Sequence, residues 1–167
     1  MRRLIVLRHA KSSWADPGQR DFDRPLNPRG RRAAAAIGDW LAGRGLIPDA
    51  ALVSAARRTR ETWAGLGPAF AEAPAAFEEG LYHAEAPALL RALQSAPEGA
   101  ATVLLLAHQP GIGDFAARLL AEAPADPDFA RYPTAAAAVI DFDAGWPEAD
   151  WGAGRLHAFT TPRALNG

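Results

Sequence analysis

Short apolar runs alternate along the chain with longer stretches of helical character. The continuous apolar runs are LIVL at 4–7, ALV at 51–53, TVLLLA at 102–107 and AAAAVIDFD at 135–143. Unbroken runs of this kind are typical of strands that are covered on both faces. The helical stretches, which end near Gly or Pro, lie at about 28–44, 55–66, 85–95 and 111–122. The alternation predicts βαβ units and therefore a three-layer α/β/α sandwich with a mostly parallel central sheet.

A long polar segment separates the first predicted strand from the first predicted helix. Asn27 and Pro28 mark the start of that helix, because Asn is a good N-cap and Pro is tolerated at the first helical position. Residues 12–26 therefore form a long loop, and such loops in compact domains often carry function. Nearer the C-terminus, residues 145–155 are loop-like, and RLHAF at 155–159 is a candidate edge strand.

Composition narrows the class of protein. The 167 residues fit one domain, 1–167, of ordinary size. A formal net charge of -1 gives no electrostatic ground for binding nucleic acid or an anionic membrane, and the absence of cysteine excludes disulfides and thiolate nucleophiles. No stretch approaches the roughly 18 apolar residues of a membrane span, and the N-terminal apolar run is too short for a signal peptide. We therefore expect a cytoplasmic protein.

Three of the predicted strands end in residues that suit phosphoryl chemistry. The first strand ends at Arg8 and His9, the second at Ser54 before SAARRTRET, and the third at His108. The carboxyl ends of parallel strands meet at one edge of a sheet, where ligands bind. Arginine matches phosphate oxygens with its planar fork, and a neutral imidazole can attack phosphorus to form a phosphohistidine. The sequence thus predicts a cationic cup for a phosphoryl group at this edge.

The same segments resemble those of the histidine phosphatase superfamily, which includes the phosphoglycerate mutases. LRHAKSSW, SAARRTRET and LLAHQPG are similar, in order and approximate spacing, to its R-H-G, S-x-x-x-R-x-x-x-T and G-H-x-P segments. Within the superfamily, the short chain together with DRPLNPRG, LYHA and YPTAA looks most like the SixA-like phosphohistidine phosphatases. The resemblance covers residues 4 to about 143 and implies a phosphoglycerate mutase-like fold.

The resemblance also implies roles for four residues of the predicted cup. His9 aligns with the nucleophile that accepts the phosphoryl group in the superfamily. The groups that hold the phosphoryl oxygens align with Arg8, Arg58 and His108. Their physical task would be to position the substrate and to stabilise the charge that develops in the transition state.

The choice of Arg58 rests on its position in the segment SAARRTRET. Arg58 stands four residues after Ser54 and four before Thr62, a spacing that places the three residues on one helix face. Arg57 is the nearest alternative. Arg57 can also be interpreted as a residue of a solvated helix face that pairs with Glu61 at i,i+4.

The sequence departs from the superfamily at several positions. Ala10 and Ala107 stand where glycines are usual, and each adds one methyl group. Ala15 stands where the mutases usually have an asparagine that helps to bind phosphate. Ser12 or Ser13 is the candidate to supply a hydroxyl instead, and the missing asparagine argues against mutase-type substrate binding.

The acid that protonates the leaving group is left open by the sequence. Glu79 in FEEGLYHA stands near the position of a glutamate in mutase-like members, and Glu78 or no residue at all are the alternatives. A phosphohistidine substrate needs such an acid less, because its P–N bond is already labile. The roughly 48 residues between the second and third strands leave no room for a lid domain. An open cup can admit a histidine carried by another protein.

The other candidate residues have simpler interpretations. His83 and His157 follow no predicted strand end and are expected at structural or surface positions, with a small chance that His83 lines the rim. The acidic residues of the loop lack calcium-loop spacing, although Asp23 or Arg24 is placed to brace the site. No H-E-x-x-H motif and no P-loop occur, so neither a metal nor a cofactor is expected.

These observations favour a metal-independent phosphatase that works through a phospho-His9 intermediate. The expected substrate is a phosphohistidine on a signalling or phosphotransfer protein. One alternative is the same chemistry on a small phosphomonoester, such as a sugar phosphate or nucleotide, and another is a non-catalytic phosphate-binding module. The expected partner is thus a phosphorylated protein or small phosphorylated substrate, with no nucleic acid and no membrane.

Overall fold

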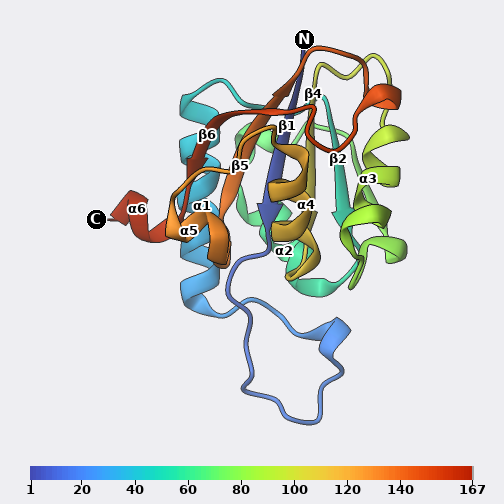
Figure 1. Ribbon diagram of the computed structural model, residues 1–167. Coiled ribbons are helices and arrows are strands. Elements are labelled where there is room, and N and C mark those ends of the chain that lie inside the picture. The colour runs from blue at the N-terminus through green and yellow to red at the C-terminus, as the bar shows by residue number, and fades with distance from the viewer. Residues whose placement is uncertain (167) are drawn as a thin grey trace.

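The computed structural model describes residues 1–166 as a six-stranded sheet with helices on both faces (Figure 1). The strands are β1 (Arg2–Arg8), β2 (Ala50–Ser54), β3 (Ala75–Glu78), β4 (Thr102–Ala107), β5 (Ala137–Phe142) and β6 (Arg155–Thr160). The α-helices are α1 (Pro28–Gly43), α2 (Arg57–Gly65), α3 (Ala86–Gln94), α4 (Gly111–Leu119), α5 (Pro127–Arg131) and α6 (Pro162–Asn166). Over these described residues, no helix is long and apolar enough to cross a membrane.

The sheet has the order β3-β2-β4-β1-β5-β6, and its strands are mostly parallel as predicted. The first four strands in this order run parallel to one another, whereas β5 is antiparallel to β1 and β6 is antiparallel to β5. The predicted edge strand at 155–159 is thus confirmed as β6. The short strand β3 is an addition that the sequence did not predict, because its four residues form an edge and none is buried.

Both faces of the sheet are covered by helices, which explains the continuous apolar runs. Along β1, Leu4 and Val6 pack into one core and Ile5 and Leu7 into the other, as side chains alternate across a strand. The first core is completed by α3, α4 and α5, and the second by α1 and α2. The predicted three-layer sandwich is therefore confirmed.

The long helix α1 begins where the sequence predicts it. The side chain of Asn27 accepts a hydrogen bond from the backbone N–H of Gly30 at 2.7 Å, and Pro28 is the first helical residue. The helices α2, α3 and α4 also lie within their predicted stretches and are shorter by up to three residues at an end.

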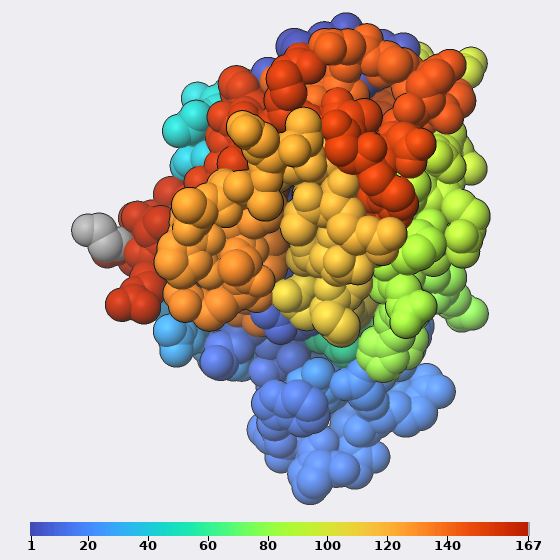
Figure 2. All heavy atoms as spheres, viewed as in Figure 1, coloured from blue at the N-terminus to red at the C-terminus, as the bar shows by residue number. Residues whose placement is uncertain are grey.

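The segment between β1 and α1 projects from the carboxyl end of the parallel strands, and it is drawn in blue in Figures 1 and 2. Its base is closed by an isolated bridge between Ser12 and Leu26. A single-turn 3-10 helix, η1 (Asp21–Asp23), interrupts an otherwise irregular course. The predicted long loop at 12–26 therefore lies beside the strand ends that were expected to form the cup.

The helix α1 packs closely on the end of α2, and this contact generates a stability prediction. A Cβ atom on Gly38 would lie 1.8 Å from the carbonyl oxygen of Leu66, whereas a Cβ on Gly43 would meet nothing within 4 Å. Because the backbone must move, we expect Gly38→Ala to lower the free energy of unfolding by roughly 1–3 kcal/mol. The control Gly43→Ala should leave it unchanged or raise it by up to about 1 kcal/mol. Urea unfolding followed by circular dichroism measures both, and equal stability of the two variants would contradict the packing.

Candidate active site

The ends of two neighbouring strands bring the two predicted histidines together. Strands β1 and β4 pair in parallel with Arg8 opposite Ala107, and the backbone N–H of His9 donates to the carbonyl of Ala107 at 3.2 Å. His9 and His108 directly follow these two strands, so their rings emerge side by side with centroids 5.2 Å apart. The convergence of these strand ends, predicted from the sequence, is confirmed.

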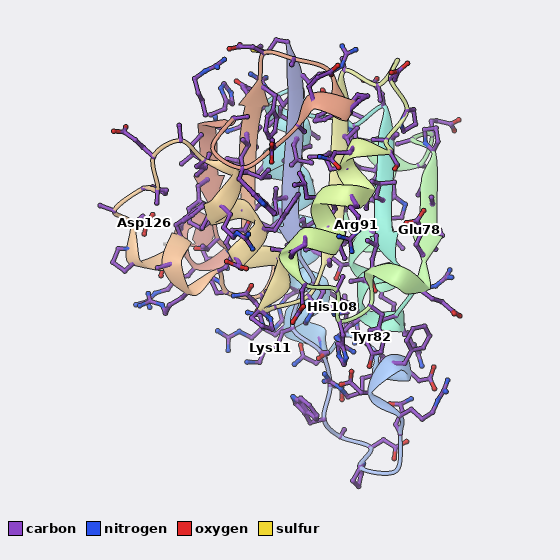
Figure 3. The ribbon with its side chains drawn as sticks, turned by 45° about the vertical axis from the view of Figure 1, so that its right-hand side comes forward. Lys11, Glu78, Tyr82, Arg91, His108 and Asp126 are labelled. Carbon is purple, nitrogen blue, oxygen red and sulfur yellow. The ribbon has the colours of Figure 1, made fainter. Side chains whose placement is uncertain are left out.

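The residues of the predicted cup line one cavity of about 340 Å³ at this edge of the sheet. We call this cavity the cup; the five predicted residues on its wall are Arg8, His9, Ser12, Arg58 and His108. The wall also includes Lys11, Trp14, Arg24, His83, Gln109 and Thr134. Figure 3 shows the labelled side chains of Lys11, Tyr82 and His108 gathered at this end of the molecule.

The imidazole of His9 is held in one tautomer. Its Nδ1 lies 2.7 Å from the carbonyl oxygen of Ala10, which can only accept, so Nδ1 carries the hydrogen and Nε2 keeps a free lone pair. Burial lowers the pKa of His9 to about 3, and the positive charge of Arg58 adds to this effect against the hydrogen bond to Ala10. The ring is therefore neutral at physiological pH, which is the state that a nitrogen nucleophile requires.

The backbone beside His9 is positioned by the helix α2. The N–H of Ala10 donates to Oγ1 of Thr62 at 2.9 Å, and that hydroxyl donates to the carbonyl of Arg58 at 2.7 Å. One threonine thus ties the strand end that carries His9 to the helix turn that carries Arg58.

The second histidine, His108, is also neutral but presents a hydrogen-bond donor. Its Nε2 lies 2.7 Å from the Oγ of Ser54, and that oxygen also accepts a long hydrogen bond from the N–H of Ala56. The hydroxyl of Ser54 has no other acceptor within residues 1–166, so we assign its hydrogen to Nε2, and Nδ1 then carries the ring hydrogen. Burial lowers the pKa of His108 to about 2, helped by the nearby His9 and Arg58. Among residues 1–166, Nδ1 is buried without a partner.

Two arginines contribute further unpaired donors to the cup. Arg8 donates from Nη1 to the carbonyl of Tyr132 at 3.0 Å, and Arg58 donates from Nη1 to the carbonyl of Asp21 at 2.8 Å. The Nε atoms of both arginines are buried and have no partner within residues 1–166. Unpaired buried donors are rare in proteins because they have lost water without a replacement. With Nδ1 of His108, they suit an anion that has several oxygen acceptors.

The carboxylate of Asp21 joins the loop to the cationic residues of the cup. It accepts hydrogen bonds from Arg58, Arg24 and the hydroxyl of Tyr82, and Nε2 of His83 lies 3.4 Å from it. Burial works against the charge, but the bonds from Tyr82 and Arg24 and the charge of Arg58 hold the pKa of Asp21 well below its usual range. Asp21 is therefore ionised and orients the buried guanidinium of Arg58. Sequence reasoning missed it, because no local pattern places residue 21 against residue 58.

His83 is the second functional candidate that the sequence did not assign to the site. The sequence predicts a structural or surface position for it, with only a small chance of a place at the rim, yet it lines the cup. Its ring stacks on that of Tyr82 with centroids 3.9 Å apart, and its backbone φ of 57° lies in the left-handed region. This turn directs the residue towards the strand ends, and nothing in the spacing of the sequence indicates it.

The loop residues brace the cup through Arg24. Its Nη1 donates to the Oγ of Ser12 at 2.6 Å, so the hydroxyl of Ser12 retains its own hydrogen for a ligand. Asp23, the other residue predicted to brace the site, instead pairs with Arg20 on the surface. Ser13, the alternative to Ser12, accepts a bond within the loop and is not on the wall of the cup.

The structure corrects the prediction that Glu79 belongs to the site. Glu79 and the alternative Glu78 are both exposed, and within residues 1–166 neither lines the cup. The physical reason is that β3 pairs with β2 at the outer edge of the sheet, with Glu78 beside Ser54, whereas the histidines follow the central strands. Figure 3 shows Glu78 on that outer strand, apart from His108.

The structure also separates the two neighbouring arginines of α2. Arg58 is buried in the cup, whereas Arg57 is exposed and pairs with Glu61 at 2.7 Å, as its alternative interpretation predicted. No group of three or more His, Asp or Glu side chains in the described part of the chain is arranged to hold a metal ion.

Comparison with known proteins places this fold and site in a family. The model of the histidine phosphatase superfamily, branch 1, matches residues 4–86. An uncharacterised protein of Mycobacterium tuberculosis is 34% identical over 162 residues, which are 94% of this chain and 100% of the relative. The chain therefore belongs to the histidine phosphatase superfamily and is a phosphatase.

Solved structures narrow the likeness within the superfamily. A protein of Nakamurella multipartitia is 31% identical with a TM-score of 0.84, over 96% of both chains. A second, from Agrobacterium tumefaciens, is 30% identical with a TM-score of 0.78, over 96% of this chain and 98% of the other. Both are named as candidate phosphohistidine phosphatases SixA. The resemblance to SixA-like proteins and the phosphoglycerate mutase-like fold are thus confirmed.

The two buried neutral histidines generate a prediction on stability against pH. In the unfolded chain they protonate near pH 6.5, whereas in the folded protein the lowered pKa values, about 3 for His9 and about 2 for His108, keep them neutral. At pH values between the folded and the unfolded pKa values, the unfolded state therefore binds more protons than the folded state. The free energy of unfolding should fall as pH decreases from 7 to 5, by up to about 1.4 kcal/mol per pH unit for each histidine.

Urea unfolding at pH 7, 6 and 5 in phosphate-free buffer measures this slope. The matched variant His9→Gln/His108→Gln should show a flatter dependence, because both titrating groups are gone. Carboxylates such as Asp21, whose pKa is lowered, titrate below this window and do not disturb the comparison. An identical slope in wild type and variant would contradict the assigned protonation states.

Proposed function

We propose that this phosphatase removes phosphate from a phosphohistidine on another protein, through a covalent phospho-His9 intermediate. The observation that carries the proposal is the arrangement around His9. Its Nδ1 is committed to Ala10, its Nε2 is unprotonated, and its cavity contains unpaired N–H donors of Arg8, Arg58 and His108. A neutral nucleophile among cationic donors is what transfer of a phosphoryl group requires.

The reaction then proceeds in two displacements. In the first, the lone pair on Nε2 of His9 attacks phosphorus and the bond from phosphorus to the substrate imidazole breaks. The electron pair of that bond stays on the departing nitrogen, which takes a proton from solvent. In the second, water attacks the phosphorus of phospho-His9, and the bond from phosphorus to Nε2 breaks with its electron pair returning to Nε2. The attacking water loses a proton to solvent, and inorganic phosphate leaves. His9 returns to its neutral form, ready for another cycle.

The hydrogen-bond donors of the cup stabilise the negative charge of the phosphoryl group during its transfer. Arg8 and Arg58 supply fixed positive charge, and the neutral His108 supplies an N–H that points to no other group of residues 1–166. Because the site is largely buried, these donors are held in place by the protein before the substrate arrives. Such preorganised donors stabilise a transition state without a further cost of reorientation.

The wall of the cup favours phosphohistidine over a phosphate ester. An alkoxide is a poor leaving group and needs a proton donor, for which glutamic acid is a common choice. Over residues 1–166, no Asp or Glu lines the cup. The P–N bond of phosphohistidine is labile and makes less demand on such an acid. The names of the two SixA structures agree with this choice of substrate.

The first prediction from this mechanism concerns the nucleophile and the substrate. Wild type should release phosphate from a phosphohistidine-bearing protein much faster than from p-nitrophenyl phosphate. His9→Ala should lower both rates by about 10³-fold or more, because the covalent route is removed. Glu79→Gln is the control and should stay within about twofold of wild type, since its side chain is outside the cup. Phosphate release is measured with EDTA present.

Two other results would redirect the assignment. Strong hydrolysis of the ester without activity on the phosphoprotein would establish the small-molecule phosphatase instead. Phosphate binding by wild type with no release from either substrate would establish a non-catalytic module.

The second prediction separates the adjacent arginines of α2. Arg58→Ala removes a buried donor from the cup and should lower kcat by about 10²–10³-fold. Arg57→Ala removes only an exposed ion pair with Glu61 and should change kcat by less than about threefold. Circular dichroism establishes that both variants are folded. Equal losses in the two variants would count against the role given to Arg58.

A further inference from the structure

A second cavity adjoins the cup and has a cationic wall. It has a volume of about 260 Å³, lies between α1, α5 and α6, and shares Lys11 and Thr134 with the cup. We call this cavity the basic groove; its cations are Lys11, Arg29, Arg131 and Arg163. In Figure 2, α5 in orange and α6 in red lie next to each other on the left, above blue spheres of the N-terminal part of the chain.

The groove gathers positive charge that the protein as a whole does not have. The chain carries 18 basic and 19 acidic residues, yet the groove presents four cations and a single carboxylate, Asp128. Asp128 pairs with Arg131. Lys11, Arg29 and Arg163 are exposed and form no ion pair within residues 1–166. The local field is therefore positive beside the cup, although the net charge is -1.

Three helices that are distant in sequence place these cations around one hollow. Arg29 is in the first turn of α1, Arg131 is the last residue of α5, and Arg163 is in α6. An adjoining hollow shares Arg29 and Arg163 and adds Arg32. A run of like charges along one helix is usually a solvated face, but a ring of cations from separate elements around a cavity is a feature of tertiary structure.

We propose that the basic groove binds an acidic segment of the phosphoprotein substrate, through carboxylates that lie near the phosphohistidine in that protein. The inference rests on the proposed function and adds a docking site to it. Arginine forks match carboxylates in a bidentate manner, and complementary charge raises the rate of encounter. Because Lys11 and Thr134 belong to both cavities, a polypeptide with its phosphohistidine in the cup extends directly into the groove.

Two synthetic peptides of equal length test this docking site. Each contains one histidine that is phosphorylated with phosphoramidate, flanked by glutamates in one peptide and by glutamines in the other. For wild type at low ionic strength, we expect kcat/KM to be about tenfold higher for the glutamate peptide. The preference should shrink in 0.5 M NaCl, because salt screens exposed charges. It should disappear in the variant Arg29→Glu/Arg163→Glu, which does not alter residues of the cup.

The readout is the ratio of kcat/KM for the two peptides within each enzyme, so a general loss of activity does not affect it. Arg91→Glu is the matched control, since Arg91 is exposed on α3 outside the groove, and it should keep the wild-type ratio. Equal kcat/KM for both peptides in wild type, or an unchanged ratio in the double variant, would overturn the proposal.

Free phosphohistidine separates failure of docking from failure of the proposed function. If wild type cleaves it but shows no preference between the peptides, only the docking site is wrong. If wild type cleaves no phosphohistidine substrate, the proposed function is wrong. The groove is then tested by fluorescence anisotropy with the labelled, unphosphorylated glutamate peptide. Weaker binding by Arg29→Glu/Arg163→Glu than by wild type and Arg91→Glu supports the site, and equal binding by all three overturns it.

Discussion

The burial of a guanidinium beside two imidazoles is the constraint on which the rest of the site depends. Arg58 is only 3% exposed, and a buried charge is tolerated only with a partner, which Asp21 supplies. Because both imidazoles are buried and lie close to the positive charge of Arg58, His9 and His108 are held neutral. Their neutrality divides the work: one ring keeps a lone pair for attack, and the other keeps an N–H for an acceptor.

Two parts of the fold hold this arrangement in place: the paired strands β1 and β4, and the long loop between β1 and α1. The parallel pairing of β1 and β4 fixes the spacing of the two histidines, because a sheet in which both faces are packed cannot shift its register without exposing its cores. The long loop then brings Asp21 and Arg24 to the strand ends, and Thr62 ties the backbone next to His9 to α2. The rigid sheet thus carries the reactive ring, and the loop completes its surroundings.

The distribution of charge connects the cup with the surface around it. At the cup, Asp21 pairs with Arg58 and balances part of the positive charge, and the unpaired donors are left for a ligand. Outside it, the basic groove continues the positive field across three helices. A phosphatase for a protein substrate needs both parts: the cup recognises the phosphoryl group, which many molecules carry, and the surface selects the polypeptide that bears it.

Local patterns were enough to predict the layered sheet, the strand-end residues Arg8, His9 and His108, and the start of α1 at Asn27, because apolar periodicity and helix capping depend on neighbouring residues. The short helix α5 was not predicted, although it begins with a similar local signal: the capping residue Asp126 is followed by a proline. The pairing of Asp21 with Arg58, the place of His83 on the wall of the cup and the position of Glu79 outside it follow only from the packing of the whole fold. Those placements depend on where a loop and an edge strand lie relative to the central strands, and no local pattern encodes that relation.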